Sequence, residues 1–301
     1  MIRLFALNAL LMTAFGCGSK TPVAWENTYP VYNGAAGFYF AENAPFPHES
    51  RADGYTRNGV TYPVVSHYLD NTVGVYIPSG FDEERPVTIL YYFHGHNNNV
   101  RNALLEFKLT EMVFNSTKNC ILVFPQGPLD VPDSAGGKLE EANGLRNLHD
   151  EITAKLIADG KLSSGTVDSV YLSGHSGAYK ILHNCLAKGG LNDLVTDVYL
   201  LDASYGGLND FTDWMMANPQ KRFVSIYTAH LEDENNEMMQ TLTSSKVSFR
   251  ELDEDNAFGH ILRDNPRTFI FANKSDHNGT VSMLQEFLET SNAASRGVSE
   301  N

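Results

Sequence analysis

The sequence has few cysteines and no excess of positive charge. Its 301 residues include 3 cysteines, and 22 lysines and arginines stand against 36 aspartates and glutamates, for a formal net charge of -14. Nucleic-acid binding relies on clustered lysines and arginines, so nucleic acid is not expected as a partner. No internal repeat is visible, and 42% hydrophobic with 19% charged residues is an ordinary globular composition.

The cysteines form no Cys-x-x-Cys motif, so neither Cys120 nor Cys185 is assigned a chemical role. Cys120 opens an apolar, strand-like run, and Cys185 lies in a helix-like segment. Two separate buried thiols and a disulfide between them are therefore equal alternatives.

The N-terminal apolar run, residues 4–15, is too short to span a bilayer. It follows Arg3 and precedes the small residues 16–19, a pattern typical of a secretory signal. Because Cys17 sits at the expected cut, the segment resembles a bacterial lipoprotein signal, which implies lipidation of Cys17. Phe15 departs from that pattern, since a small residue is usual there. A plain cleaved signal and an uncleaved signal anchor are the alternatives.

We therefore expect an exported protein, periplasmic or at the cell surface on a lipid anchor, and otherwise secreted. Residues 1–17 form the expected signal peptide. Residues 18–58 form a tether and an aromatic extension that packs on the main domain, because so many rings left in water would forfeit burial energy. Residues 59–290 form the expected catalytic domain, and residues 291–301, rich in Ser, Asn, Ala and Gly, a disordered tail.

The remaining chain alternates strand and helix patterns. Residues 63–69 and 72–78 predict a hairpin around Asp70 and Asn71. Further strands are expected at 87–93, 120–124, 168–174, 197–201, 223–227, 247–252 and 268–272. Helices are expected at 101–115, 145–156, 179–188, 210–216, 238–242 and 281–288. This order predicts an α/β fold with three layers, a mostly parallel central sheet and an N-terminal antiparallel hairpin.

The stretch from Asp168 to Tyr179 organises the prediction of function. A β-branched and aromatic run ends in the small-residue turn Gly174-His175-Ser176-Gly177-Ala178, and a helical segment follows. This is typical of a nucleophile elbow, in which a sharp turn exposes a serine above a helix N-terminus. Ser176 is the predicted nucleophile.

Other candidate groups end neighbouring strands, and the carboxyl ends of parallel strands lie at one edge of the sheet. The strand 87–93 is followed by His94-Gly95-His96, whose backbone N–H groups at Gly95 and His96 are expected to form an oxyanion hole with that of Gly177. A simple strand-end turn is the alternative.

Asp202 ends the strand after the elbow helix, and His277 follows the last strand. An N-cap or turn aspartate and a solvated loop histidine are the structural alternatives. A carboxylate there can orient an imidazole, which takes the serine proton as general base. Glu232 and Asp233 are rival acids and His260 is a rival base.

The order Ser176, Asp202, His277, with His94-Gly95 upstream, resembles the α/β-hydrolase superfamily of esterases, lipases and peptidases over roughly residues 63–290. Ala178 departs mildly from the last glycine of Gly-x-Ser-x-Gly. The acid also departs, because many members carry it one strand later.

The resemblance implies a serine hydrolase that cleaves a carboxylic ester, of a small molecule or a polymer, through an acyl-enzyme and without a cofactor. A serine peptidase or amidase of the same fold is the first alternative. Histidines 94, 96, 230, 260 and 277 leave a metal-dependent hydrolase open, although no His-x-x-x-His pair is present. A non-catalytic binding lipoprotein on this scaffold is the third alternative.

Overall fold

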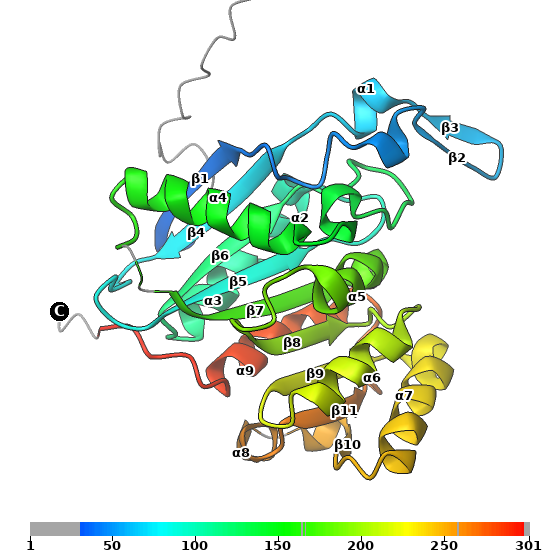
Figure 1. Ribbon diagram of the computed structural model, residues 1–301. Coiled ribbons are helices and arrows are strands. Elements are labelled where there is room, and N and C mark those ends of the chain that lie inside the picture. Colours follow the sequence, from blue (N-terminus) through cyan, green and yellow to red (C-terminus); the bar gives the residue numbers. More distant parts are fainter. Residues whose placement is uncertain (1–30, 164, 166, 258, 298–301) are drawn as a thin grey trace, which may run out of the picture.

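The computed structural model describes residues 31–163, 165, 167–257 and 259–297 (Figure 1). The expected signal peptide at 1–17, its Cys17 and most of the tether lie outside the described residues. Within the described ranges, no helix has the length and apolar character needed to cross a membrane.

A nine-stranded sheet runs through the described part of the chain (Figure 1). Its strands, in spatial order, are β1 (Gly34–Phe40), β4 (Thr72–Pro78), β6 (Cys120–Pro125), β5 (Val87–Phe93), β7 (Val167–His175), β8 (Val195–Leu201), β9 (Arg222–Tyr227), β11 (Arg267–Phe271) and β10 (Arg250–Asp253). β4 pairs antiparallel with both neighbours, and the pairs from β6 to β10 are all parallel. The predicted mostly parallel sheet is confirmed.

Strand order reverses at β5, which has β6 on one side and β7 on the other. From β5 the chain continues to β6 on one side, and from β7 it continues to β8 on the other side. In open α/β sheets, ligands bind beyond the carboxyl ends of the strands at such a reversal point. The segments that follow β5 and β7 are the His94-Gly95-His96 turn and the Ser176 turn.

The central strands are apolar on both faces because helices cover both. Every residue of β5 is buried, and alternate side chains enter opposite cores: Val87, Ile89, Tyr91 and Phe93 on one face, Leu90 and Tyr92 on the other. This is the expected pattern for parallel strands with two covered faces.

The helices divide between these two cores. One face carries α4 (Gly144–Ala158), α5 (Tyr179–Lys188), α6 (Leu208–Ala217) and α7 (Glu232–Ser244). The other carries α2 (Val100–Glu106), α3 (Leu109–Asn115), α8 (Gly259–Asp264) and α9 (Leu284–Glu289). The three-layer prediction is thus confirmed.

The helix predicted over 101–115 is two helices. Lys108, between α2 and α3, has φ 51°, a left-handed conformation that interrupts the helix. The apolar spacing continues across the break, so periodicity alone did not reveal it.

The N-terminal antiparallel pair has a different member from the one predicted. Residues 63–69 are not a strand: α1 (Val64–His67) occupies them. The partner of β4 is instead β1, with Gly34 opposite Pro78 and Phe40 opposite Thr72. Asp70 does form a local turn, since its Oδ1 accepts from the N–H of Thr72 at 2.9 Å, but that turn leads out of α1.

The expected start of the catalytic domain at residue 59 is too late. β1 is a strand of the central sheet, and Tyr39 and Phe46 are buried, so the domain includes at least residues 34–58. The hairpin of β2 (Tyr55–Arg57) and β3 (Val60–Tyr62) projects with α1 from one end of the molecule (Figure 1).

The expected disordered tail is packed over residues 291–297. Ser295 forms a β-bridge with Lys118, and Arg296 donates to the carbonyl of Ser79 at 2.5 Å. The guanidinium of Arg296 also lies 4.4 Å from the ring centroid of Phe114. Contacts of polar groups hold this segment in place, and its amino-acid composition did not predict that it would be ordered.

Of the two cysteine alternatives, the structure has separate thiols. Cys120 and Cys185 are free and buried, and they enter opposite cores with the sheet between them. Burial raises the pKa of Cys120 to about 12 and that of Cys185 further still, so both remain protonated, inert thiols.

Candidate active site

Ser176 occupies a strained turn between β7 and α5. Its φ is 55°, in the left-handed region that non-glycine residues rarely adopt. The residues 176–178 form one 3-10 turn that leads directly into α5. A strained serine between a buried strand and a helix N-terminus is the geometry predicted for a nucleophile elbow.

Steric crowding explains why the residues around Ser176 are small. A Cβ placed on Gly174 would lie 2.7 Å from Cβ of Ala178 and 2.9 Å from Cδ1 of Leu182. Gly174 therefore lets α5 approach β7 closely. Ala178 is itself buried against this glycine, so its methyl group fits where many related motifs have glycine.

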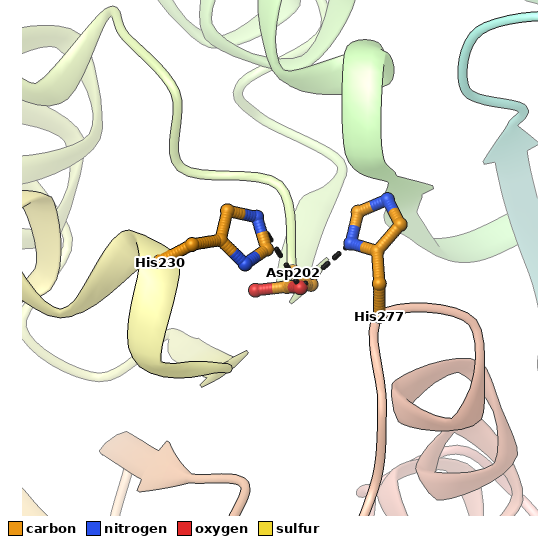
Figure 2. Close-up of side chains that lie close together, drawn as sticks. All are labelled: Asp202, His230 and His277. Carbon is orange, nitrogen blue, oxygen red and sulfur yellow. Dashed lines mark hydrogen bonds and ion pairs between the residues drawn. The ribbon is translucent and has the colours of Figure 1, made fainter.

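Asp202 and His277 meet above the same sheet edge (Figure 2). Asp202 ends β8 and is fully buried, with φ 50°. Nδ1 of His277 lies 2.7 Å from Oδ2 of Asp202. Because an ionised carboxylate only accepts hydrogen bonds, Nδ1 carries the proton and Nε2 of the neutral ring is left with its lone pair.

The environment keeps Asp202 ionised. Burial alone would raise its pKa, but hydrogen bonds from His277 and Thr228 outweigh burial and hold the pKa below the usual range. Thr228 supplies two of them: its N–H donates to Oδ1 at 2.9 Å and its hydroxyl to Oδ2 at 2.8 Å.

His175 holds His277 from the other side. Its Nε2 lies 3.0 Å from the backbone oxygen of His277, and the two ring centroids are 4.5 Å apart. Burial, followed by the nearby His277, lowers the pKa of His175 to about 4. His175 is therefore a neutral donor to that carbonyl at neutral pH. In the described part of the chain, no hydrogen bond joins the hydroxyl of Ser176 to His277, whose Nδ1 bonds to Asp202.

The turn after β5 is pressed against the elbow. A Cβ on Gly95 would lie 2.7 Å from Cβ of Ser176 and 3.3 Å from the nitrogen of Gly177. The ring of His96 covers Gly177, because a Cβ there would lie 2.5 Å from its Cδ2. Gly95, His96, Ser176 and Gly177 thus form one compact group.

His94 orients the peptide that joins Gly95 to His96. Its Nδ1 donates to the carbonyl of Gly95 at 2.8 Å, since its Nε2 accepts from the N–H of Gly127 at 3.2 Å. Burial lowers the pKa of His94, which keeps the ring neutral. Because C=O and N–H of a trans peptide point in opposite directions, the N–H of His96 points away from His94.

The ring of His96 is held by a hydrogen bond that the sequence did not predict. Its Nε2 is 2.7 Å from the hydroxyl of Ser134. The neighbouring Asp133 is fixed by a bidentate pair with Arg51, at 2.7 and 2.9 Å, and by the hydroxyl of Tyr68 at 2.9 Å. The N-terminal segment thereby anchors the long loop that ends beside the elbow.

The rival acid and base lie elsewhere. Glu232 and Asp233 are exposed in the first turn of α7, and His260 is exposed in α8. Only the carboxylate of Asp202, of these three acids, has a hydrogen bond with His277 in the described residues.

His230 is a neighbour of Asp202 that the sequence suggested only as a metal ligand. Ligand atoms of Asp202, His230 and His277 lie within 4.8 Å of one another, which is close enough for a metal ion (Figure 2). However, Nδ1 of His277 donates to Asp202, and Nε2 of His230 lies 2.7 Å from the hydroxyl of Tyr205. These atoms are engaged within the protein. His94, His96 and His260 do not belong to the group.

No protein-family model and no curated protein matches the sequence. Among solved structures, the fluorophosphonate-binding serine hydrolase F of Staphylococcus aureus, substrate bound, is similar: 11% identity, 86% of this chain and 100% of that chain covered, TM-score 0.51. The chain has the α/β-hydrolase fold. An S-formylglutathione hydrolase from Agrobacterium tumefaciens matches at 12% identity, covering 85% of this chain and 93% of that one, with TM-score 0.49.

β8, at whose end Asp202 lies, is directly beside the elbow strand β7. Here the following strand, β9, supplies Thr228 and His230 at its carboxyl end, and both interact with Asp202.

Proposed function

We propose that this protein is a serine hydrolase that cleaves carboxylic esters through an acyl-enzyme intermediate. The observation that carries the proposal is the 2.7 Å hydrogen bond between Asp202 and His277 at the sheet edge that presents the strained Ser176. The ester class is favoured over the amide because an alcohol departs more readily than an amine.

In this mechanism the serine hydroxyl turns toward Nε2 of His277 when substrate binds. His277 takes the proton as Ser176 attacks the ester carbonyl, and it returns the proton to the leaving alcohol. The negative charge of Asp202 stabilises the imidazolium form of His277. Water then attacks the acyl-serine by the same route in reverse.

The oxyanion is assigned to backbone N–H groups of Gly177 and of the Gly95–His96 turn. Two features support this: Gly95 packs directly against Ser176, and the His94 bond to the Gly95 carbonyl turns the N–H of His96 the other way. Donors aimed at a developing negative charge lower the barrier by a few kcal/mol each, about 3 to 4 in measured cases.

The test is labelling with a fluorophosphonate probe, which phosphonylates an activated serine. The wild type is expected to label and Ser176→Ala to remain unlabelled. Ser173→Ala is the matched control: Ser173 lies on the same strand, is fully buried, and its hydroxyl has no partner among the described residues. Unchanged labelling of Ser176→Ala would overturn the nucleophile assignment.

Two further measurements separate the alternatives. Hydrolysis of p-nitrophenyl acetate but not of acetyl p-nitroanilide is expected of an esterase, and the reverse preference would indicate an amidase. Activity that chelators abolish, with no serine labelling, would favour a metal ion at Asp202, His230 and His277.

We also propose that the protein is exported and held to a membrane by lipid on Cys17. The proposal rests on the sequence of residues 1–19 alone. Mass measurement of the mature N-terminus tests it: an unlipidated Cys17, or a cut elsewhere, contradicts the lipoprotein assignment.

A further inference from the structure

Asp202 has an imidazole on each side, and only one of them belongs to the proposed mechanism (Figure 2). Nδ1 of His277 lies 2.7 Å from Oδ2 of Asp202, and Nε2 of His230 lies 3.7 Å from the same oxygen. One ligand atom from each of the three residues lies within 4.8 Å of the other two. Two imidazole nitrogens and one carboxylate oxygen are a donor set that suits Zn²⁺.

The spacing of these atoms is close to that of a zinc site. Bonds of about 2.0 to 2.2 Å in a tetrahedron place the ligand atoms roughly 3.3 Å apart, and the two distances to Oδ2, 2.7 and 3.7 Å, lie on either side of this value. The ring centroids of His230 and His277 are 5.4 Å apart, and two imidazoles on one tetrahedral ion have centroids roughly 5 Å apart. Side-chain shifts of roughly half an ångström therefore bring both nitrogens to bonding distance.

The group can be reached from solvent although its carboxylate is buried. The side chains of His230 and His277 are 45% and 37% exposed, and that of Asp202 is 0% exposed. An ion would enter between the two rings and meet the carboxylate beneath them (Figure 2). Three protein ligands leave the fourth tetrahedral position to water. The net charge of -14 also favours the approach of a cation.

The hydrogen bonds of His230 leave a lone pair on the nitrogen that faces Asp202. The carboxylate only accepts, so the Thr228 hydroxyl donates to Oδ2 at 2.8 Å and its oxygen accepts from Nδ1 of His230 at 2.6 Å. Nε2 of the neutral ring therefore has no proton, and it accepts from the hydroxyl of Tyr205 at 2.7 Å. A metal ion can take this lone pair while the Nδ1 bond to Thr228 stays intact, and the exposed Tyr205 can turn its hydroxyl to water.

Binding at His277 has a different consequence, because its Nδ1 carries a proton. That nitrogen can bind a metal ion only when the proton of the neutral ring is on Nε2 instead. The ring keeps one proton in total, so the exchange needs no further acid or base. Nε2 then has no lone pair to accept the proton of Ser176. An ion at this position removes the general base without touching the serine.

We propose that Asp202, His230 and His277 form an inhibitory zinc site. This inference rests on the proposed function. The ion binds Oδ2 of Asp202, Nε2 of His230 and Nδ1 of His277, and it holds His277 in the tautomer that cannot act as a base. Inhibition is reversible, since a chelator that removes the ion lets the proton return to Nδ1. Mg²⁺ and Ca²⁺ prefer oxygen ligands and do not inhibit.

The first experiment measures the rate of fluorophosphonate labelling of the full chain at rising Zn²⁺ concentrations. The wild type is expected to lose labelling with Zn²⁺, to regain it with EDTA, and to be unaffected by Mg²⁺. In His230→Gln, the Zn²⁺ concentration for half-inhibition is expected to rise at least about tenfold, because even outer partners of metal ligands contribute about 10- to 100-fold to affinity. Each rate is compared with that of the same variant without metal.

The matched control is His183→Gln. His183 pairs with Asp210 at 2.7 Å and does not belong to the group of three, so its loss is expected to leave the half-inhibition concentration unchanged. His230 and His183 both have partly exposed side chains, and both variants are expected to fold. The thermal midpoint of each without metal verifies this.

The second experiment measures binding without any activity. Co²⁺ in a tetrahedral site absorbs visible light, so the absorption of Ser176→Ala titrated with Co²⁺ reports the site directly. Ser176 is not a ligand, so this variant is expected to bind Co²⁺ as the wild type does. Ser176→Ala/His230→Gln is expected to bind at least about tenfold more weakly.

The two proposals fail in different ways. If Zn²⁺ does not slow labelling of the wild type, or slows that of His230→Gln at the same concentration, the inhibitory site is refuted and the esterase proposal stands. Faster labelling with Zn²⁺ also refutes it. If Ser176→Ala labels as the wild type does, the proposed function fails, and the inhibition proposed on it fails too, whatever Co²⁺ shows about the three ligands.

Discussion

Gly95 offers the sharpest test of how the turn after β5 meets the elbow. Its backbone does not adopt a positive φ, so alanine introduces no backbone strain there and acts only through its methyl group. That methyl group would lie 2.7 Å from Cβ of Ser176, 3.0 Å from the backbone oxygen of His175 and 3.3 Å from the nitrogen of Gly177.

Carbon atoms pack at about 3.5 to 4.0 Å, so the turn or the elbow must move by roughly 1 Å. All three neighbouring atoms belong to or lie next to the backbone, and no flexible side chain can give way instead. A displacement of about 1 Å between reacting groups can lower the rate about 10²-fold. Overpacking also destabilises a protein by about 1 to 3 kcal/mol.

We therefore expect Gly95→Ala to lower kcat for p-nitrophenyl acetate by about two orders of magnitude with a modest fall in the thermal midpoint. Gly74→Ala is the matched control. Its Cβ would lie 2.9 Å from Cγ1 of Val100, so it overpacks a buried site on β4 without touching the elbow. It should lose stability and keep kcat. A Gly95→Ala enzyme with wild-type kcat would refute the close contact between the turn and Ser176.

Two further predictions concern stability at low pH and the pair formed by Arg51 and Asp133. Burial lowers the pKa of His149 to about 4 from 6.5, so the unfolded chain binds a proton that the folded chain does not; stability is complete above about pH 6.5 and falls by about 3 kcal/mol by about pH 4. His149→Gln should flatten this part of the curve of unfolding free energy against pH, measured with urea, and an unchanged slope would contradict the assignment. Arg51→Met leaves the carboxylate of Asp133 without its bidentate partner. It should cost about 2 kcal/mol, below the range for fully buried pairs because Arg51 keeps some contact with water. It should also raise KM more than Glu49→Gln, an exposed neighbour on the same turn; equal KM values for the two variants would show that the loop is held without Arg51.

Long apolar segments were the part of the fold that the sequence predicted well. The strand at 87–93 and the helix at 179–188 agree with β5 and α5 residue for residue. Both have unambiguous patterns, a continuous apolar run for a strand covered on both faces and an amphipathic helix after the small-residue turn. In both cases the pattern that predicts the element lies within the segment itself.

The errors arose where the partner is distant. β1 has the sequence GAAGFYF, which resembles a turn-rich segment, and it becomes a strand only through pairing with β4, more than 30 residues later. The local turn at Asp70 suggested a nearer partner. The segment 291–297 is similar, since the bonds that hold Arg296 come from residues about 180 and 217 positions away.

For the site, strand ends were sufficient to propose Ser176, Asp202 and His277, because the carboxyl ends of parallel strands converge. Thr228 could not be assigned in the same way. Its importance lies in two hydrogen bonds to Asp202, between the segments that follow β9 and β8, and the sequence contains no pattern that specifies such contacts. The one available signal was a second histidine, His230, three residues after a strand end.

The strand order at one edge also constrains how the chain is completed during synthesis. β10 precedes β11 in the sequence but lies outside it, and its partner in the sheet is β11. When a nascent chain has emerged only as far as β10, β9 is the edge strand of the sheet, although all its residues are buried in the complete fold. β10 cannot yet join the sheet, because its partner β11 has not been made. Open edge strands invite aggregation, and β11 also precedes His277. Assembly of this edge, protection from aggregation and arrival of the proposed base thus coincide once the segment from β11 to His277 has left the ribosome.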